Sequence, residues 1–190
     1  MLVNYENKEL ATVYIETDAG AGSGFLISDD GICFTCFHVI KGAKEIYVRI
    51  LNGKCEKEVW MGSVIYGDEE HDYALLKLDV DHPTYYFELE TNISILKTGD
   101  DVALFGFPFG CNISDSSMDL EPSLTKGYIA SRNKIHGQNC LFLDIRSCPG
   151  NSGGPAFAIK SGKYILIVIV IVLLLKLLWE LFKNAGIAMV

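Results

Sequence analysis

The most specific stretch of this 190-residue chain runs from Cys148 to Pro155 and reads Cys-Pro-Gly-Asn-Ser-Gly-Gly-Pro. Glycines around Ser152 let the backbone turn sharply and leave the serine hydroxyl exposed. The amides of Gly150 and Ser152 can then point at one position, as an oxyanion hole requires. A surface turn could have the same composition, so the serine needs a catalytic partner before the stretch indicates chemistry.

That partner is a base, because a serine hydroxyl is a weak nucleophile until its proton is removed. The chain has four histidines, of which His82 and His136 fall in turn-like sequences. His38 differs because it ends the apolar run 32–38, which is typical of a β-strand. A polar ring with apolar residues on both sides needs a hydrogen-bonding partner. His38 is therefore the predicted general base.

The histidine in turn needs a carboxylate that fixes its tautomer and stabilises its charged form. Asp72 opens the apolar run 72–78, whereas the other acidic residues cluster in charged turns where solvation is the default. The order His38, Asp72, Ser152 is one of the known chain orders of a Ser-His-Asp triad. We therefore predict that these three residues form a catalytic triad.

Short β-rich segments, separated by Gly, Asn, Asp and Pro, recur through the first 160 residues and favour an all-β sandwich or barrel. A tight turn is expected at Asp29-Asp30-Gly31, between two of them. The expected strands are 12–16, 24–28, 32–38, 45–51, 57–65, 73–78, 101–107, 125–131, 139–144 and 155–159.

Charge and cysteine usage exclude several functions. Sixteen Lys and Arg against 24 Asp and Glu give a net charge of −8, which argues against a sequence-independent nucleic-acid binder. The polar, acidic start resembles no signal peptide, so a cytoplasmic location is expected. The six cysteines are expected to be free thiols. Cys33 and Cys36 lie three apart on the expected strand, point to opposite faces, and are not expected to share a metal ion.

The C-terminal region departs from this pattern, because 17 of the 19 residues in 164–182 are apolar. Residues 165–172 are almost all β-branched, which favours a buried strand. In the segment 173–184, Lys176, Glu180 and Lys183 share one helical face, which favours an amphipathic helix. Two alternatives stay open: a membrane span, or a helix lying at the membrane surface, either of which would give membrane association through 164–182.

The chain resembles the trypsin-like serine peptidases of the HtrA (high-temperature-requirement) type. The matching stretches, in the family's order, are 22–31, 37–39, 72–77, 99–110, 125–131 and 149–155.

The resemblance implies one all-β peptidase domain over 1–190 that contains two six-stranded β-barrels. The first barrel would cover about 1–82, a connection 83–98, and the second barrel 99–190 with the atypical segment 173–184. His38 and Asp72 would come from the first barrel and Ser152 from the second. The implied activity is serine endopeptidase cleavage of polypeptides through an acyl-enzyme, with no cofactor and no metal.

Several features of the chain bear on how closely it follows this family. Arg146, six residues before the serine, lies near the family's S1 pocket and would favour acidic P1 residues. Asn151 stands where digestive relatives have an Asp, so activation by a freshly cut N-terminus is not expected. A PDZ domain is not expected within these 190 residues. The unusual apolar segment falls where the family builds one pocket wall, although 186–190 resembles the family's closing strand. The alternative function is a catalytically inactive fold that binds peptides or associates with a membrane.

Overall fold

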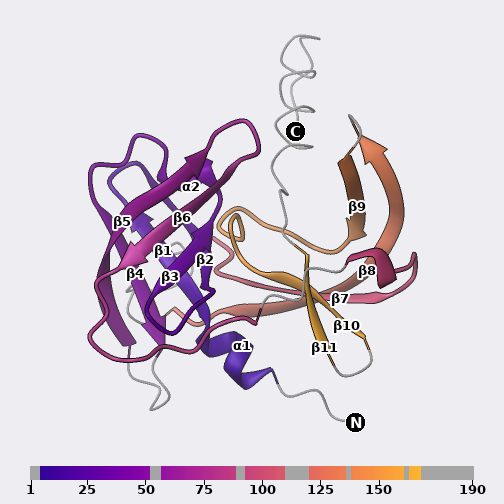
Figure 1. The fold of residues 1–190 in the computed structure, drawn as a ribbon, viewed down its shortest axis with the longest axis horizontal. Coiled ribbons are helices and arrows are strands. Elements are labelled where there is room, and N and C mark those ends of the chain that lie inside the picture. The colour runs from indigo at the N-terminus through magenta and orange to yellow at the C-terminus, as the bar shows by residue number, and fades with distance from the viewer. Residues whose placement is uncertain are drawn as a thin grey trace.

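The computed structural model describes residues 5–51, 57–88, 93–109, 120–135, 138–160 and 163–167. Two antiparallel sheets lie side by side in it, with few and short helices (Figure 1). The elements of the first half are α1 (Glu6–Leu10), β1 (Thr12–Thr17), β2 (Gly20–Leu26), β3 (Ile32–Thr35), α2 (Phe37–Ile40), β4 (Ile46–Leu51), β5 (Lys57–Asp68) and β6 (Tyr73–Leu78). Those of the second half are η1 (Ile93–Ile95), β7 (Asp101–Gly106), β8 (Ser123–Ile135), β9 (Gln138–Asp144), β10 (Ala156–Lys160) and β11 (Lys163–Ile167).

The first sheet is a closed barrel in the order β1-β2-β3-β6-β5-β4. Burial alternates strictly along β6: Ala74, Leu76 and Leu78 are fully buried, and the residues between them are half-buried. Side chains of a strand alternate between faces, so this pattern places one face in the barrel core. A register shift in β5 between Val64 and Tyr66 bends that long strand around the barrel.

The second sheet has the order β11-β10-β7-β8-β9 among the described residues. Its core includes Leu104 of β7, Ile129 of β8 and Ile165 of β11, all nearly fully buried. The predicted all-β, trypsin-like double-barrel class is confirmed, and the expected strand 165–172 starts within β11. The remainder of that strand, the segment 173–184 and the expected closing strand 186–190 lie outside the described residues. Within the described part, no helix has the length and apolar character needed to cross a bilayer.

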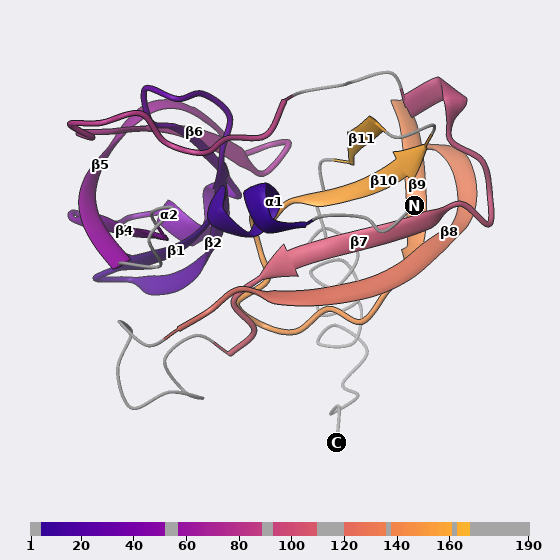
Figure 2. The same cartoon turned by 90° about the horizontal axis from the view of Figure 1, so that it is seen from below.

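A buried aromatic cluster joins the two sheets. The ring of Phe157 in β10 lies 5.8 Å from that of Phe87 in the connection and 6.2 Å from that of Phe105 in β7. Phe87 in turn lies 5.4 Å from Phe25 of the first barrel. The helix α1, which the sequence did not predict because five residues carry no helical period, lies at this junction (Figure 2). Burial of each large aromatic side chain contributes about 1.5–3 kcal/mol of stabilising free energy. Because these rings lie between the two halves, their burial holds the halves together.

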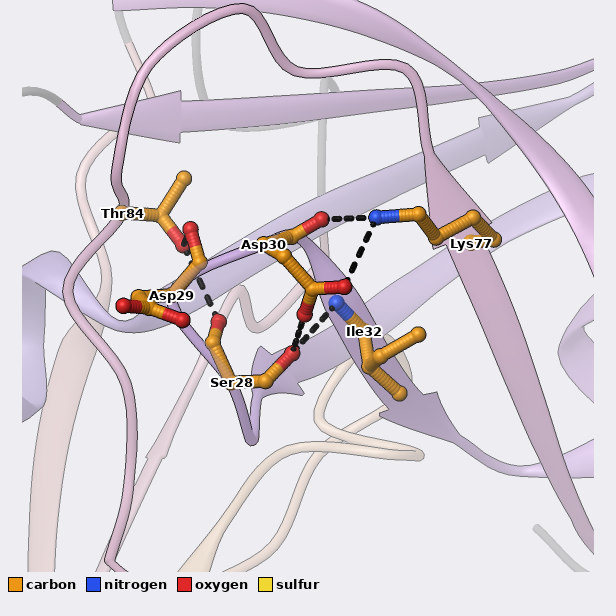
Figure 3. A network of polar contacts seen from close by, with 6 residues as sticks. All are labelled: Ser28, Asp29, Asp30, Ile32, Lys77 and Thr84. Atoms are coloured by element: carbon orange, nitrogen blue, oxygen red, sulfur yellow. Dashed lines mark hydrogen bonds and ion pairs between the residues drawn. The ribbon is translucent and has the colours of Figure 1, made fainter.

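The connection after β6 is also tied to the turn between β2 and β3 (Figure 3). The Thr84 amide donates to the Asp29 carbonyl at 2.9 Å, and its hydroxyl donates to the Ser28 carbonyl at 3.2 Å. Ser28 Oγ donates to the Asp30 carboxylate, which also contacts Lys77 of β6. The Ser28 hydrogen bond, followed by Lys77, holds the pKa of Asp30 below its usual value. The turn expected at 29–31 is present and anchors the chain as it leaves the first barrel.

Candidate active site

His38 and Asp72 meet at one end of the first barrel. The strand β3 ends at Thr35, and His38 lies on the helical turn α2. The sequence had predicted His38 at the end of a strand, which is wrong. Its backbone amide donates to Asp72 Oδ1 at 2.8 Å, and its Nδ1 lies 2.7 Å from Asp72 Oδ2. One carboxylate therefore both satisfies an amide of the turn and orients the ring.

Asp72 is held in an unusual backbone conformation immediately before β6. Its φ is +56°, in the left-handed region that Asp and Asn tolerate better than other side chains with a Cβ. The Asp72 side chain is 9% exposed and that of His38 is 24% exposed, so the carboxylate is shielded while the ring has access to solvent. An ionised carboxylate only accepts hydrogen bonds, so Nδ1 carries the proton and Nε2 is left as an acceptor.

The serine turn is shaped by hydrogen bonds within the second half. The Asn151 amide donates to the Cys148 carbonyl, and the Phe109 amide donates to the Pro149 carbonyl at 2.6 Å. Gly150 has a φ of +97°, and a Cβ there would lie 2.3 Å from the Phe107 carbonyl oxygen, so only glycine fits. In a trans peptide the N–H points away from the C=O. The Pro149 carbonyl is engaged by Phe109, so the Gly150 amide faces the opposite direction.

Ser23 of β2 fastens this turn to the first barrel. Its amide donates to the Ser152 carbonyl at 2.8 Å. Its hydroxyl donates to the Gly150 carbonyl at 2.6 Å and accepts from the Phe107 amide at 2.9 Å. Ser23 is fully buried in the structure. Its role was not predicted from the sequence, where the flanking Gly22 and Gly24 were the available signal.

Gly153 brings the serine turn against the histidine turn. Its φ is +85°, and a Cβ there would lie 2.2 Å from the Ser23 carbonyl oxygen and 2.4 Å from Thr35 Oγ1. It also makes a backbone hydrogen bond with the Cys36 thiol, two residues from His38. The contacts therefore bring residues 150–153 to the place where β3 passes into α2.

Cys36 belongs to this centre. Its Sγ, a ring nitrogen of His38 and a carboxylate oxygen of Asp72 lie within 4.8 Å of one another. Burial and the charge of Asp72 raise the pKa of the Cys36 thiol to about 12, against a smaller lowering by the Gly153 hydrogen bond. The sequence did not predict this grouping, because Cys36 and His38 were both expected on one strand. In the structure β3 ends at Thr35, Cys36 precedes α2 and His38 lies on that helical turn.

Two further predicted positions have different surroundings. Arg146 is exposed in the stretch between β9 and the serine turn. Asp144, two residues earlier in the chain, accepts a hydrogen bond from Tyr128. The pocket role of Arg146 stays a prediction. Asn151 is 4% exposed, and its Oδ1 has no hydrogen-bond partner among the described residues.

Two other histidines, His71 and His82, also contact carboxylates. His71 repeats the bonding pattern of His38: its amide donates to Asp68 Oδ1 and its Nδ1 lies 2.9 Å from Asp68 Oδ2. That pair is exposed, and the Asp68 hydrogen bond raises the pKa of His71. His82 Nε2 contacts Glu58. A histidine–carboxylate pair alone therefore does not mark the site; its position beside the serine turn does.

A closed barrel beside a second antiparallel sheet, with a His–Asp pair next to a glycine-rich serine turn, defines the chymotrypsin-like class of serine peptidase folds. A family model described as the trypsin-like peptidase domain matches residues 22–165. The chain belongs to this family, as the resemblance in the sequence predicted.

Curated relatives point the same way. The chain is 37% identical over 141 residues to a probable periplasmic serine endoprotease DegP-like of Halomonas elongata, covering 72% of this chain and 26% of that protein. It is 33% identical over 145 residues to the protein of the same name from Hahella chejuensis, covering 74% and 28%. The match thus spans about a quarter of each relative's length. Both names say periplasmic, so the expected cytoplasmic location is wrong.

Solved structures share the fold. Deg5 superposes with a TM-score of 0.69 at 23% identity, covering 89% of this chain and 88% of that one. The MamO protease domain of Magnetospirillum magneticum, in its apo form, gives 0.63 at 18% identity, covering 91% and 98%. At these identities the two structures establish the arrangement of the strands alone.

Proposed function

We propose that the chain is a serine endopeptidase in which Ser152 is the nucleophile, His38 the general base and Asp72 the residue that orients the base. The observation that carries the proposal is the pair of contacts by which the His38 backbone amide and the His38 ring nitrogen Nδ1 meet the two Asp72 carboxylate oxygens, made where residues 150–153 pack against the first barrel. His38 Nε2 would take the Ser152 proton as the hydroxyl attacks a peptide carbonyl, and would return it to the leaving amine.

The amides of Gly150 and Ser152 would stabilise the oxyanion of the tetrahedral intermediate. The engaged Pro149 and Gly150 carbonyls support this role, because they fix the peptide planes on both sides of Gly150 before substrate binds. Preorganised donors of this kind typically contribute about 2.7–4 kcal/mol each to transition-state stabilisation. The bond from Ser23 to Gly150 would make the first barrel part of the oxyanion machinery.

Polypeptides are the proposed substrates, since the curated relatives are named serine endoproteases. The same names support a periplasmic location for this chain. In this proposal Arg146 favours an acidic side chain at the residue before the cut, because a guanidinium at the pocket would pair with a carboxylate.

A fluorophosphonate probe, which forms a covalent bond only with an activated serine, tests the proposal. We expect rapid labelling of the folded chain, no labelling of Ser152→Ala, and labelling of His38→Ala slowed by several orders of magnitude. His71→Ala is the matched control, because His71 has the same pair of hydrogen bonds to a carboxylate on an exposed turn. Its labelling rate should equal that of the unmodified chain.

Absence of labelling in a chain shown to be folded by circular dichroism would refute the catalytic proposal and favour a peptide-binding module. Loss of labelling in His71→Ala as severe as in His38→Ala would also count against it, because the assignment of the base would then be wrong. Cleavage-site profiling on a peptide library then tests the role of Arg146, whose replacement by Ala should abolish any preference for acidic residues.

A further inference from the structure

Cys36 adds a third metal-binding group to the His38–Asp72 pair. The three ligand atoms lie within 4.8 Å of one another, and they come from a thiol, an imidazole and a carboxylate. These are the ligand types by which proteins hold Zn²⁺. The sequence predicted no metal here, because Cys36 was paired with Cys33, the neighbouring cysteine of the same expected strand. Cys33 takes no part in this group, in which Cys36 joins His38 and Asp72.

The geometry is close to what a zinc ion requires. Zinc bonds of about 2.0–2.3 Å in a tetrahedron set the ligand atoms about 3.3–3.8 Å apart. Separations of up to 4.8 Å between the ligand atoms must therefore shrink by at most about 1.3 Å, and the 2.7 Å contact of Nδ1 with Asp72 must open by about 0.6 Å if Nδ1 is the ligand. Rotations about side-chain bonds supply both changes. The His38 side chain is 24% exposed, so the group is open to solvent on this side, and water would be the fourth ligand.

We propose that Cys36, His38 and Asp72 form an inhibitory site for Zn²⁺ or a cation of similar softness. This inference rests on the proposed function of His38. On binding, the thiol S–H bond breaks, its proton leaves to solvent, and the thiolate, one ring nitrogen and the carboxylate each donate an electron pair to the ion. The imidazole stays neutral, with its one proton on the nitrogen that the metal does not use. No electron is transferred.

Binding in either orientation of the ring removes the general base. If Zn²⁺ takes Nδ1, the ring proton resides on Nε2, which can no longer accept the proton of Ser152. If Zn²⁺ takes Nε2, the lone pair that would accept that proton is already used. Asp72 is drawn away from the ring in both cases. The thiol also sets the metal preference, because thiolate ligands select Zn²⁺ over Mg²⁺ or Ca²⁺.

The test compares labelling rates of the whole chain with a fluorophosphonate, first in chelator and then with increasing ZnCl₂. We expect saturating Zn²⁺ to slow labelling of the unmodified chain at least tenfold and Mg²⁺ to have no effect. Cys36→Ala should need at least tenfold more Zn²⁺ for half-inhibition, each variant being compared with its own metal-free rate. Cys33→Ala is the matched control: it removes another buried thiol three residues away and should retain the sensitivity of the unmodified chain.

A second measurement does not depend on catalysis. Co²⁺ bound to a thiolate shows a sulfur-to-metal charge-transfer absorption, which we expect in the unmodified chain and in Cys33→Ala, and which Cys36→Ser should lose. Because a serine side chain has nearly the volume of a cysteine side chain, Cys36→Ser tests the site even if Cys36→Ala does not fold.

Equal Zn²⁺ sensitivity in the chain with and without Cys36, or a cobalt–thiolate band that survives Cys36→Ser, would overturn the site. If no chain is labelled at all while the band depends on Cys36, the metal site holds and the proposed peptidase function fails.

Discussion

Replacing Asp72 by Asn separates its catalytic role from its structural one. Asn fits the left-handed φ of +56° as Asp does, and its carbonyl oxygen can still accept the His38 amide at 2.8 Å. The side-chain NH₂ then faces Nδ1, which was 2.7 Å from Oδ2. Because the NH₂ is a donor, Nδ1 must become the acceptor and the ring proton moves to Nε2. The backbone stays in place while the base is lost.

The size of the effect follows from two losses. The charge-assisted hydrogen bond to the imidazolium that forms in the transition state is worth about 1.5–3 kcal/mol. The wrong tautomer adds the cost of moving the proton off Nε2 before it can act. Together we expect a loss of about 10³–10⁴ in rate, which corresponds to about 4–5.5 kcal/mol. Thermal unfolding should change little, because the amide of His38 keeps its partner.

The assay is the fluorophosphonate labelling rate of Ser152, read alongside thermal unfolding, for Asp72→Asn and Asp72→Ala. Asp72→Ala should also lose stability, about 1–3 kcal/mol for the unsatisfied His38 amide and about 1–2 kcal/mol for the left-handed backbone. Asp68→Asn, which alters the equivalent exposed pair, should label at the normal rate. A folded Asp72→Asn that retains more than a tenth of the labelling rate would refute the assigned role.

Three other changes test how the site is held. Ser23→Ala should lower the free energy of unfolding in urea by about 1–3 kcal/mol, because the buried Phe107 amide loses its acceptor. It should also slow labelling at least tenfold, because the Gly150 carbonyl loses its donor. An unchanged labelling rate would show that Ser23 does not position the oxyanion turn. Gly153→Ala should give no folded protein, or one at least about 3 kcal/mol less stable, since the added Cβ would lie 2.2 Å from a backbone oxygen at a φ of +85°; native-like urea unfolding would contradict the close approach. Asp100→Asn should cost about 0.5–1 kcal/mol at neutral pH, after allowance for solvent screening. The Lys160 hydrogen bond holds the pKa of Asp100 below its usual 3.8, so this contribution is present above that pH and disappears as the pH falls through the lowered pKa; urea unfolding at pH 7 and pH 3 should show the difference between the two chains shrinking, and a constant difference would exclude an electrostatic origin.

Local patterns in the chain predicted the fold class well. The strand positions followed from short apolar runs between turn residues, as at 73–78, where alternate burial matches the side-chain period of a strand. The apolar run 32–38 misled at its end, because β3 stops at Thr35. The next residues form a helical turn whose amide is satisfied by Asp72, and no local pattern reports a partner 34 positions away.

By itself, the sequence of this chain determined the all-β class, the family and the residue types from which the site is proposed, since strand periodicity and glycine-rich turns are written in neighbouring residues. Only the tertiary structure decided that Ser23 bridges Gly150 and Phe107, and that the Cys36 thiol stands with the His38–Asp72 pair. The physical reason is that hydrogen bonds and ligand geometry act over a few ångströms in space. The segments that supply these atoms are brought together by packing of the barrels.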